Sequence, residues 1–169
     1  MRIYNKSFFL LIILLFSSFC LAEKDLSIRF PLTKKINATM TLSDFVVDKH
    51  IISKYGNYIY AIDGKLFWGT DGGIPKKYIK DFSIEIDDKT ISLEVSSMFG
   101  IENITSKDSM QGRIKIKALN DYIYRVSANF SDGAGAYIVQ WLIINDRSAR
   151  VFIGNGEELS DVWDYAKDN

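Results

Sequence analysis

Apolar and polar residues alternate over several stretches of the chain, which is the period of a β-strand with one buried face. In residues 83–95, apolar side chains at every second position run up to a turn at residues 87–89 and resume after it. In residues 58–68, Asp63-Gly64 separates two short apolar runs and supplies the positive backbone torsions that a tight turn needs. Each stretch predicts a hairpin.

A longer meander is predicted in the second half of the chain. Its strand-like runs cover residues 113–119, 122–130, 137–144 and 148–153, with Asn-Asp pairs at two of the turns. The third run is almost wholly apolar, as is typical of a central strand buried on both faces. One more strand is expected over residues 44–52. The segment before Ala38 is expected to be a loop or a short strand.

Helical periodicity is confined to the end of the chain. An apolar stripe recurs at three- and four-residue spacing through residues 159–166, behind two acids that favour a helix N-terminus. One helical turn is also expected over residues 75–79, because proline suits a first helical position. Residues 23–169 are therefore expected to form one mainly β domain. It would be an antiparallel sandwich, barrel or curved meander with a short C-terminal helix.

The first 22 residues have the layout of a cleavable signal peptide. Arg2 and Lys6 precede an unbroken apolar run over residues 8–16, and Cys20-Leu21-Ala22 offers small residues for cleavage between Ala22 and Glu23. Nine apolar residues rise only about 14 Å as a helix, against roughly 30 Å of bilayer hydrocarbon. We therefore expect a periplasmic or secreted protein with no stable membrane span, while lipid attachment at Cys20 is an alternative.

Charge and cysteine content narrow the functional classes. Removing Arg2 and Lys6 from 21 basic residues leaves 19 against 21 acidic ones, a formal charge of about −2. Such a chain lacks the basic stripe that nucleic-acid binding requires, so no nucleic-acid partner is expected. Cys20 is the only cysteine and leaves with the signal peptide, which excludes a disulfide in the mature protein.

Standard catalytic residues are sparse. His50 is the only histidine and is expected to be a solvent-facing strand residue. A Ser-His-Asp site has no independent support, and a zinc site lacks ligands. We assign no catalytic residue, no metal ligand and no cofactor. Calcium stays a minor alternative, because the sequence has no dense series of alternating aspartates.

Two acidic, glycine-bearing turns are the most unusual local features. They cover residues 69–73 and 131–135 and contain Asp71 and Asp132. Both are longer than a minimal hairpin needs, although turn formation alone would also explain them. If the two turns meet at one end of the sheet, they form an acidic patch bordered by aromatic residues. The candidate binding residues are Trp68, Asp71, Phe130, Asp132 and Tyr137.

Three stretches together resemble a set of small exported bacterial β-domain proteins of unassigned role. They are the turn at residues 69–75, Val95-Ser-Ser-Met-Phe-Gly100, and residues 130–137 with Trp141. The resemblance covers roughly residues 56–154. It implies a role similar to that of periplasmic immunity or inhibitor proteins, by analogy only.

These observations favour an exported binding protein, with a protein partner in the cell envelope. It would be an immunity or inhibitor protein that blocks a toxin or an envelope hydrolase. The alternative is a glycan or peptidoglycan binding module that stacks sugars on aromatic rings. A hydrolase that uses two carboxylates as acid and base is the third hypothesis.

Overall fold

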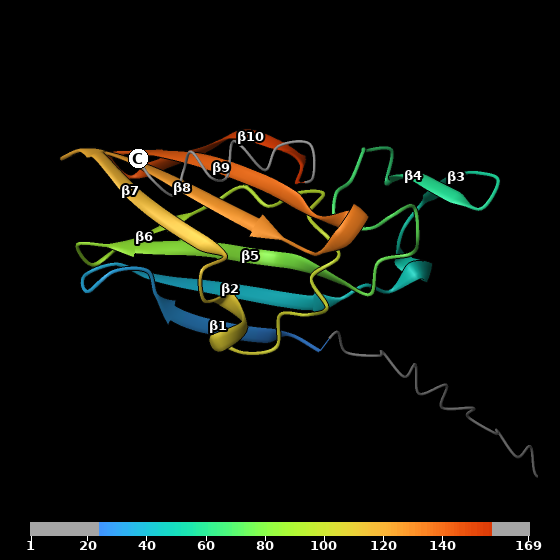
Figure 1. The fold of residues 1–169 in the computed structure, drawn as a ribbon, viewed down its shortest axis with the longest axis horizontal. Coiled ribbons are helices and arrows are strands. Elements are labelled where there is room, and N and C mark those ends of the chain that lie inside the picture. Colours follow the sequence, from blue (N-terminus) through green and yellow to red (C-terminus); the bar gives the residue numbers. More distant parts are fainter. Residues whose placement is uncertain (1–23, 157–169) are drawn as a thin grey trace, which may run out of the picture.

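The computed structural model describes residues 24–156, which form two four-stranded antiparallel sheets and one separate hairpin (Figure 1). The first sheet has the order β1-β2-β5-β6 and the second the order β10-β9-β8-β7. The strands of the first sheet are β1 (Leu26–Pro31), β2 (Asn37–Asp44), β5 (Lys77–Ile86) and β6 (Lys89–Ser92). The strands of the second are β7 (Ile114–Asn120), β8 (Ile123–Phe130), β9 (Tyr137–Ile144) and β10 (Arg147–Asn155).

The two sheets pack face to face as a β-sandwich around one large apolar core. Phe82 of β5 and Trp141 of β9 meet edge to face with ring centroids 5.5 Å apart, and both side chains are fully buried. The indole nitrogen of Trp141 donates a hydrogen bond of 2.8 Å to the carbonyl of Glu94, just beyond β6. The fold class expected from the alternating pattern is therefore confirmed, and the open choice of architecture resolves to a sandwich.

Several predicted elements are confirmed. The meander forms the whole second sheet, with the apolar run at β9 between β8 and β10. The turn between β5 and β6 places both Asp87 and Asp88 at positive φ. The Asp63-Gly64 turn also has two positive φ angles, as a tight hairpin turn requires.

The strand predicted over residues 44–52 is wrong. β2 ends at Asp44, and the chain then makes a short 3₁₀ helix, η1 (Val47–Lys49). The N–H groups of Lys49 and His50 close back onto the carbonyls of Val46 and Val47 at 3.0 Å. The valines favour a strand locally, but this turn takes the chain out of the sheet so that Phe45 is buried in a separate cluster.

One further expectation is wrong. Residues 75–79 contain no helical turn, because β5 begins at Lys77 and pairs there with Asp44 of β2. The segment before Ala38, expected to be a loop or a short strand, holds the six-residue strand β1, whose alternate residues Ile28 and Phe30 face the core. The expected C-terminal helix and the signal peptide lie outside the described residues.

The separate hairpin consists of β3 (Ile52–Tyr55) and β4 (Tyr58–Ile62) and lies beyond one end of the two sheets (Figure 1). Residues 58–62 were expected to pair with residues 65–68 across Asp63-Gly64. The structure has only an isolated bridge between Ile62 and Lys65 there. β4 instead pairs with β3. Among residues 24–156, no helix is long and apolar enough to cross a bilayer.

Candidate binding surface

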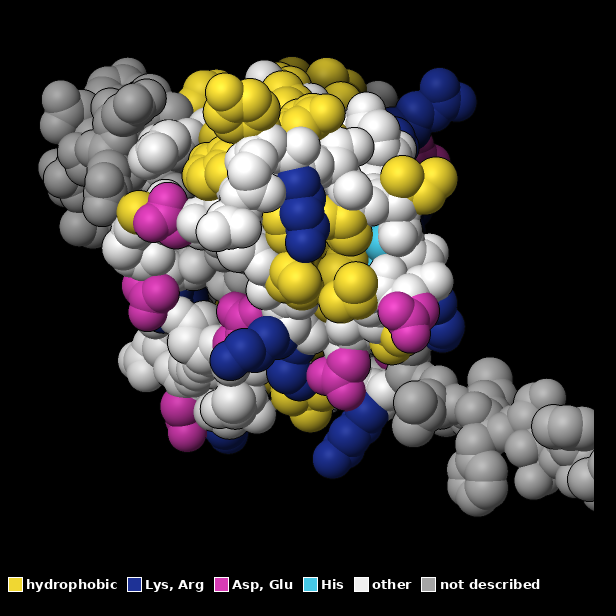
Figure 2. All heavy atoms as spheres, turned by 90° about the vertical axis from the view of Figure 1, so that its right-hand side faces the viewer, with side chains coloured by type: hydrophobic (Ala, Val, Ile, Leu, Met, Phe, Trp, Pro, Cys, Tyr) yellow, Lys and Arg dark blue, Asp and Glu magenta, His cyan; other side chains and the backbone are white. Residues whose placement is uncertain are grey.

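Exposed apolar side chains are concentrated at the hairpin end of the molecule. Seven of the eleven large apolar side chains that the described residues expose fall between residues 47 and 74. Figure 2 shows hydrophobic side chains gathered over this end, with Lys or Arg side chains among them and Asp or Glu side chains around them. Large apolar side chains that gather on one exposed surface are typical of an interaction site. We call the following seven residues the hairpin surface: Val47, Ile51, Tyr55, Tyr58, Tyr60, Leu66 and Ile74.

Three tyrosines share one face of the hairpin. Tyr55 and Tyr58 are directly opposed in the register of β3 and β4, and directly opposed residues point to the same face. Tyr60 is two positions further along β4, at a register shift opposite Ser53 and Lys54, and it is exposed like Tyr58 while Ile59 between them is buried. Their exposed fractions are 86%, 56% and 50%. Tyrosine combines a large apolar ring with a polar hydroxyl, which suits it to protein interfaces.

The hairpin has an apolar core of its own, separate from the sandwich core. Phe45, Ile59, Ile62 and Phe99 form this second cluster, and the rings of Phe45 and Phe99 meet edge to face at 5.5 Å. An isolated two-stranded hairpin is only marginally stable in water. Burial of a large apolar side chain contributes about 1.5–3 kcal/mol. The second cluster therefore gives the hairpin a fixed position from which it presents its tyrosines.

A contact between His50 and Asp63 joins the two ends of the hairpin, just before β3 and just after β4. His50 Nδ1 lies 2.8 Å from Asp63 Oδ2, while Asp63 Oδ1 accepts a 2.8 Å hydrogen bond from the N–H of Ile51. The imidazole stacks on the ring of Phe45 at 4.3 Å. The hydrogen bonds from His50 and Ile51 lower the pKa of Asp63 below its ordinary value. His50 is thus a structural residue beside η1, contrary to the expectation of a solvent-facing strand residue.

The acidic turn at residues 69–73 supports the other edge of the hairpin. The N–H of Ile59 donates to the carbonyl of Gly72 at 2.9 Å. The Tyr58 ring packs directly on Gly72, where an added β-carbon would come within 2.2 Å of two ring carbons. Gly72 also has a φ of +68°. Glycine is therefore required at this position by close approach and by backbone conformation together.

The two acidic turns meet at this end of the sandwich. Ser131 Oγ donates to the carbonyl of Gly69 at 3.1 Å, and Gly135 packs against the backbone of Gly69. Asp71 and Asp132 are both exposed on these contacting turns. The turns are 62 residues apart in sequence at the Ser131–Gly69 contact. The juxtaposition on which the predicted patch depended is therefore present.

The aromatic border expected for that patch needs correction. Phe130 and Tyr137 are fully buried, and their rings pack against each other at 5.6 Å inside the sandwich. Neither ring is available to a ligand, because both point to the inner side of their strands. Trp68 is half-buried and packs against the large core. The most exposed aromatic residues at this end are the hairpin tyrosines, which sequence reasoning missed.

The chemical groups on this surface suit recognition better than catalysis. Asp71 and Asp132 are both exposed on the contacting turns, whereas the two carboxylates of a glycosidase flank the bond that is cleaved. Within residues 24–156, no three His, Cys, Asp or Glu side chains gather as a metal ion would require. What the end offers is a fixed, apolar and tyrosine-rich surface beside two carboxylates.

Comparison with known proteins identifies no relative of this chain. No family model, no curated protein and no solved structure matches it. The functional argument therefore depends on the geometry of the hairpin end.

Proposed function

We propose that this chain is an exported binding protein that recognises a protein partner through the hairpin surface. In this proposal it works as an inhibitor or immunity protein in the periplasm or outside the cell. The observation that carries the proposal is the set of exposed tyrosines on a hairpin with its own apolar core. A surface that is already ordered loses little conformational entropy on binding, and this favours affinity.

The tyrosine face favours a protein partner over a glycan. Protein interfaces are enriched in tyrosine and gain most of their affinity from a few buried aromatic anchors. The hairpin surface adds aliphatic side chains at positions 47, 51, 66 and 74, which increase apolar contact area but offer no hydrogen bonds to sugar hydroxyls. Glycan binding is the second candidate, because exposed tyrosine rings also stack on sugars.

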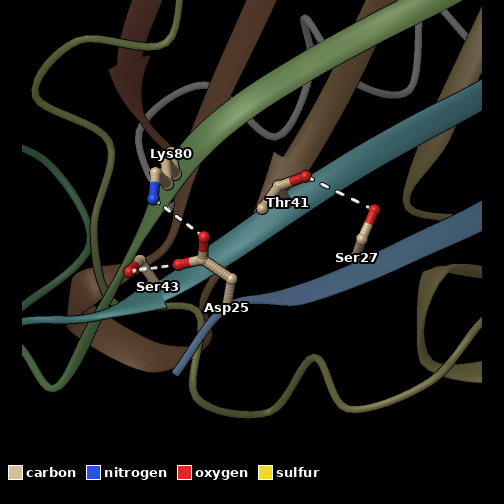
Figure 3. A network of polar contacts seen from close by, with 5 residues as sticks. All are labelled: Asp25, Ser27, Thr41, Ser43 and Lys80. Atoms are coloured by element: carbon tan, nitrogen blue, oxygen red, sulfur yellow. Dashed lines mark hydrogen bonds and ion pairs between the residues drawn. The ribbon is translucent and has the colours of Figure 1, made fainter. Parts of the chain in front are cut away.

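The start of the first sheet is consistent with export and cleavage after Ala22. Asp25, three residues later, accepts hydrogen bonds of 2.8 Å from Ser43 on β2 and from Lys80 on β5 (Figure 3). The hydrogen bonds from Lys80 and Ser43 lower the pKa of Asp25. Cleavage between Ala22 and Glu23 would leave these contacts intact. N-terminal sequencing of the protein from its native host is expected to begin at Glu23.

Site-specific photo-cross-linking tests the binding proposal in cells. A photoreactive phenylalanine analogue replaces Tyr60 on the hairpin or, as the matched control, Tyr122 at the opposite end of the sandwich. Tyr122 is 68% exposed, so both positions present a similar ring to solvent. We expect one protein adduct of fixed size from position 60 and none from position 122. Equal labelling at both positions, or no protein adduct at position 60, would contradict the proposal.

A further inference from the structure

The hairpin exposes side chains on both of its faces. Tyr55, Tyr58 and Tyr60 occupy one face, whereas Lys54 is directly opposed to Ile59 in the register and therefore belongs to the other. Ile59 is 2% exposed and packs in the second cluster, but Lys54 remains exposed at the rim of that cluster. A flat partner touches only one face of such a hairpin. Contact with both faces requires a concave partner.

The charge on the hairpin has one sign. Residues 49–62 contain two lysines, Lys49 and Lys54, and no aspartate or glutamate. The Lys54 side chain has no hydrogen-bond or ion-pair partner in the part of the chain that the structure describes. The carboxylates that border this range are Asp48, in η1, and Asp63, which is held by His50, and neither forms an ion pair with Lys54. A partner that surrounds the hairpin therefore meets an unpaired cation and an apolar face.

We infer that the hairpin inserts into a concave, carboxylate-lined cleft of a folded protein partner. This inference rests on the proposed function and specifies the chemistry of its partner. Tyr58 and Tyr60 line one wall of the contact, and the Lys54 ammonium pairs with a carboxylate on the other. Enzymes that cleave glycosidic bonds have clefts of this chemistry, with two carboxylates on either side of the bond to be broken. Occupying such a cleft excludes the substrate.

Zero-length carbodiimide coupling tests the carboxylate directly, because it joins an amine to a carboxylate only when the two are in contact. The full chain carrying the photoreactive residue at position 60 is first cross-linked in its native host, and a second sample is coupled with carbodiimide. Lys54 is varied to Arg, which keeps the charge but has no amine to couple, and to Glu, which reverses the charge. Lys89→Glu, on an exposed position at the far turn, is the charge-matched control.

The inference predicts that both chemistries give an adduct with the same protein, and that peptide mapping joins Lys54 to an aspartate or glutamate. Lys54→Arg is expected to remove the carbodiimide adduct and keep the photo-adduct. Lys54→Glu is expected to reduce the photo-adduct at least tenfold, while Lys89→Glu leaves its yield within twofold.

A photo-adduct that persists in Lys54→Glu would overturn the inference of a carboxylate-lined cleft. It would leave the proposal of a protein-binding hairpin surface intact, so the two proposals can fail separately. An adduct of twice the chain mass would show that the hairpin binds a second copy of this protein, and it would overturn the inferred cleft. Retention of the protein on cell-wall sacculi, with no protein adduct at position 60, would overturn both and favour a glycan ligand.

Discussion

The ring of Tyr58 lies on the backbone of Gly72, so the acidic turn directly sets the position of one exposed tyrosine. Gly72→Ala is expected to displace this ring and to strain a backbone at φ +68°, lowering the free energy of unfolding by about 1–3 kcal/mol. The yield of the photo-adduct at position 60 should also fall. Chemical denaturation measures the change in the free energy of unfolding, and gel densitometry measures the adduct yield.

Gly73→Ala is the matched control for this prediction, since no atom lies within 4 Å of its added β-carbon. It is expected to change stability by less than about 0.5 kcal/mol. If both alanine variants behave alike, the close contact between Tyr58 and Gly72 does not determine the position of the hairpin.

The bond between His50 and Asp63 predicts acid sensitivity of the hairpin. The pKa of Asp63 is lowered from 3.8 in the folded protein, first by the hydrogen bond from His50 and then by that from Ile51. A lowered pKa contributes stability that is fully present above the unfolded value, and this stability is lost as the pH falls through the folded value. Asp63→Asn should therefore lower Tm at neutral pH, with a difference from the wild type that shrinks below about pH 4. Parallel Tm curves from pH 2 to 7 would refute this role.

Tyr137→Phe is expected to leave stability unchanged or to raise it by up to about 1 kcal/mol. The Tyr137 hydroxyl is fully buried and has no hydrogen-bond partner among residues 24–156, and burial raises the pKa of this phenol well above its ordinary value. Tyr137→Ala, in contrast, should cost about 3–5 kcal/mol through the cavity that it leaves. Loss of more than about 1 kcal/mol in the Phe variant would show that the hydroxyl has a stabilising contact.

The exposed carboxylates on the contacting turns are expected to tune binding from the edge of the surface. Because the inferred cleft carries carboxylates, Asp71→Lys or Asp132→Lys should strengthen binding of the partner protein by roughly 3- to 10-fold, through faster association, without unfolding the domain. Asp121→Lys, at the far end of the sandwich, is the charge-matched control and should have no effect. If all three variants bind alike in titration calorimetry at low salt, the two turns do not take part in recognition.

Local sequence patterns predicted the second sheet well, because its strands are consecutive and each turn has its own residue signal. The Asp63-Gly64 turn was predicted correctly for the same reason. The partner of β4 was not, since the sequence on both sides of this strand is apolar and only packing of Ile59 and Ile62 against Phe45 and Phe99 decides between them. Non-local packing also explains why residues 44–52 turn away from the sheet.

The candidate site was predicted only in part. Asp71 and Asp132 were recognised from their turns, but contact between those turns depends on how the two sheets stack, which no local pattern encodes. Phe130 and Tyr137 were misplaced because aromatic residues beside a turn are as suitable for a core as for a surface. The spacing of Tyr58 and Tyr60 on a strand, with Tyr55 across a Gly56-Asn57 turn, was the signal that would have pointed to the hairpin.

The affinity of Tyr60→Ala for the protein captured at position 60, compared with that of Tyr122→Ala, tests the central claim most directly. Both residues are exposed tyrosines, Tyr60 on β4 and Tyr122 in the turn between β7 and β8, and Figure 1 shows β4 and this turn at opposite ends of the molecule. A binding role for the hairpin surface predicts that Tyr60→Ala raises Kd by about 30-fold, corresponding to about 2 kcal/mol, with Tm almost unchanged. Tyr122→Ala should bind like the wild type. Equal Kd values for the two variants would contradict the account.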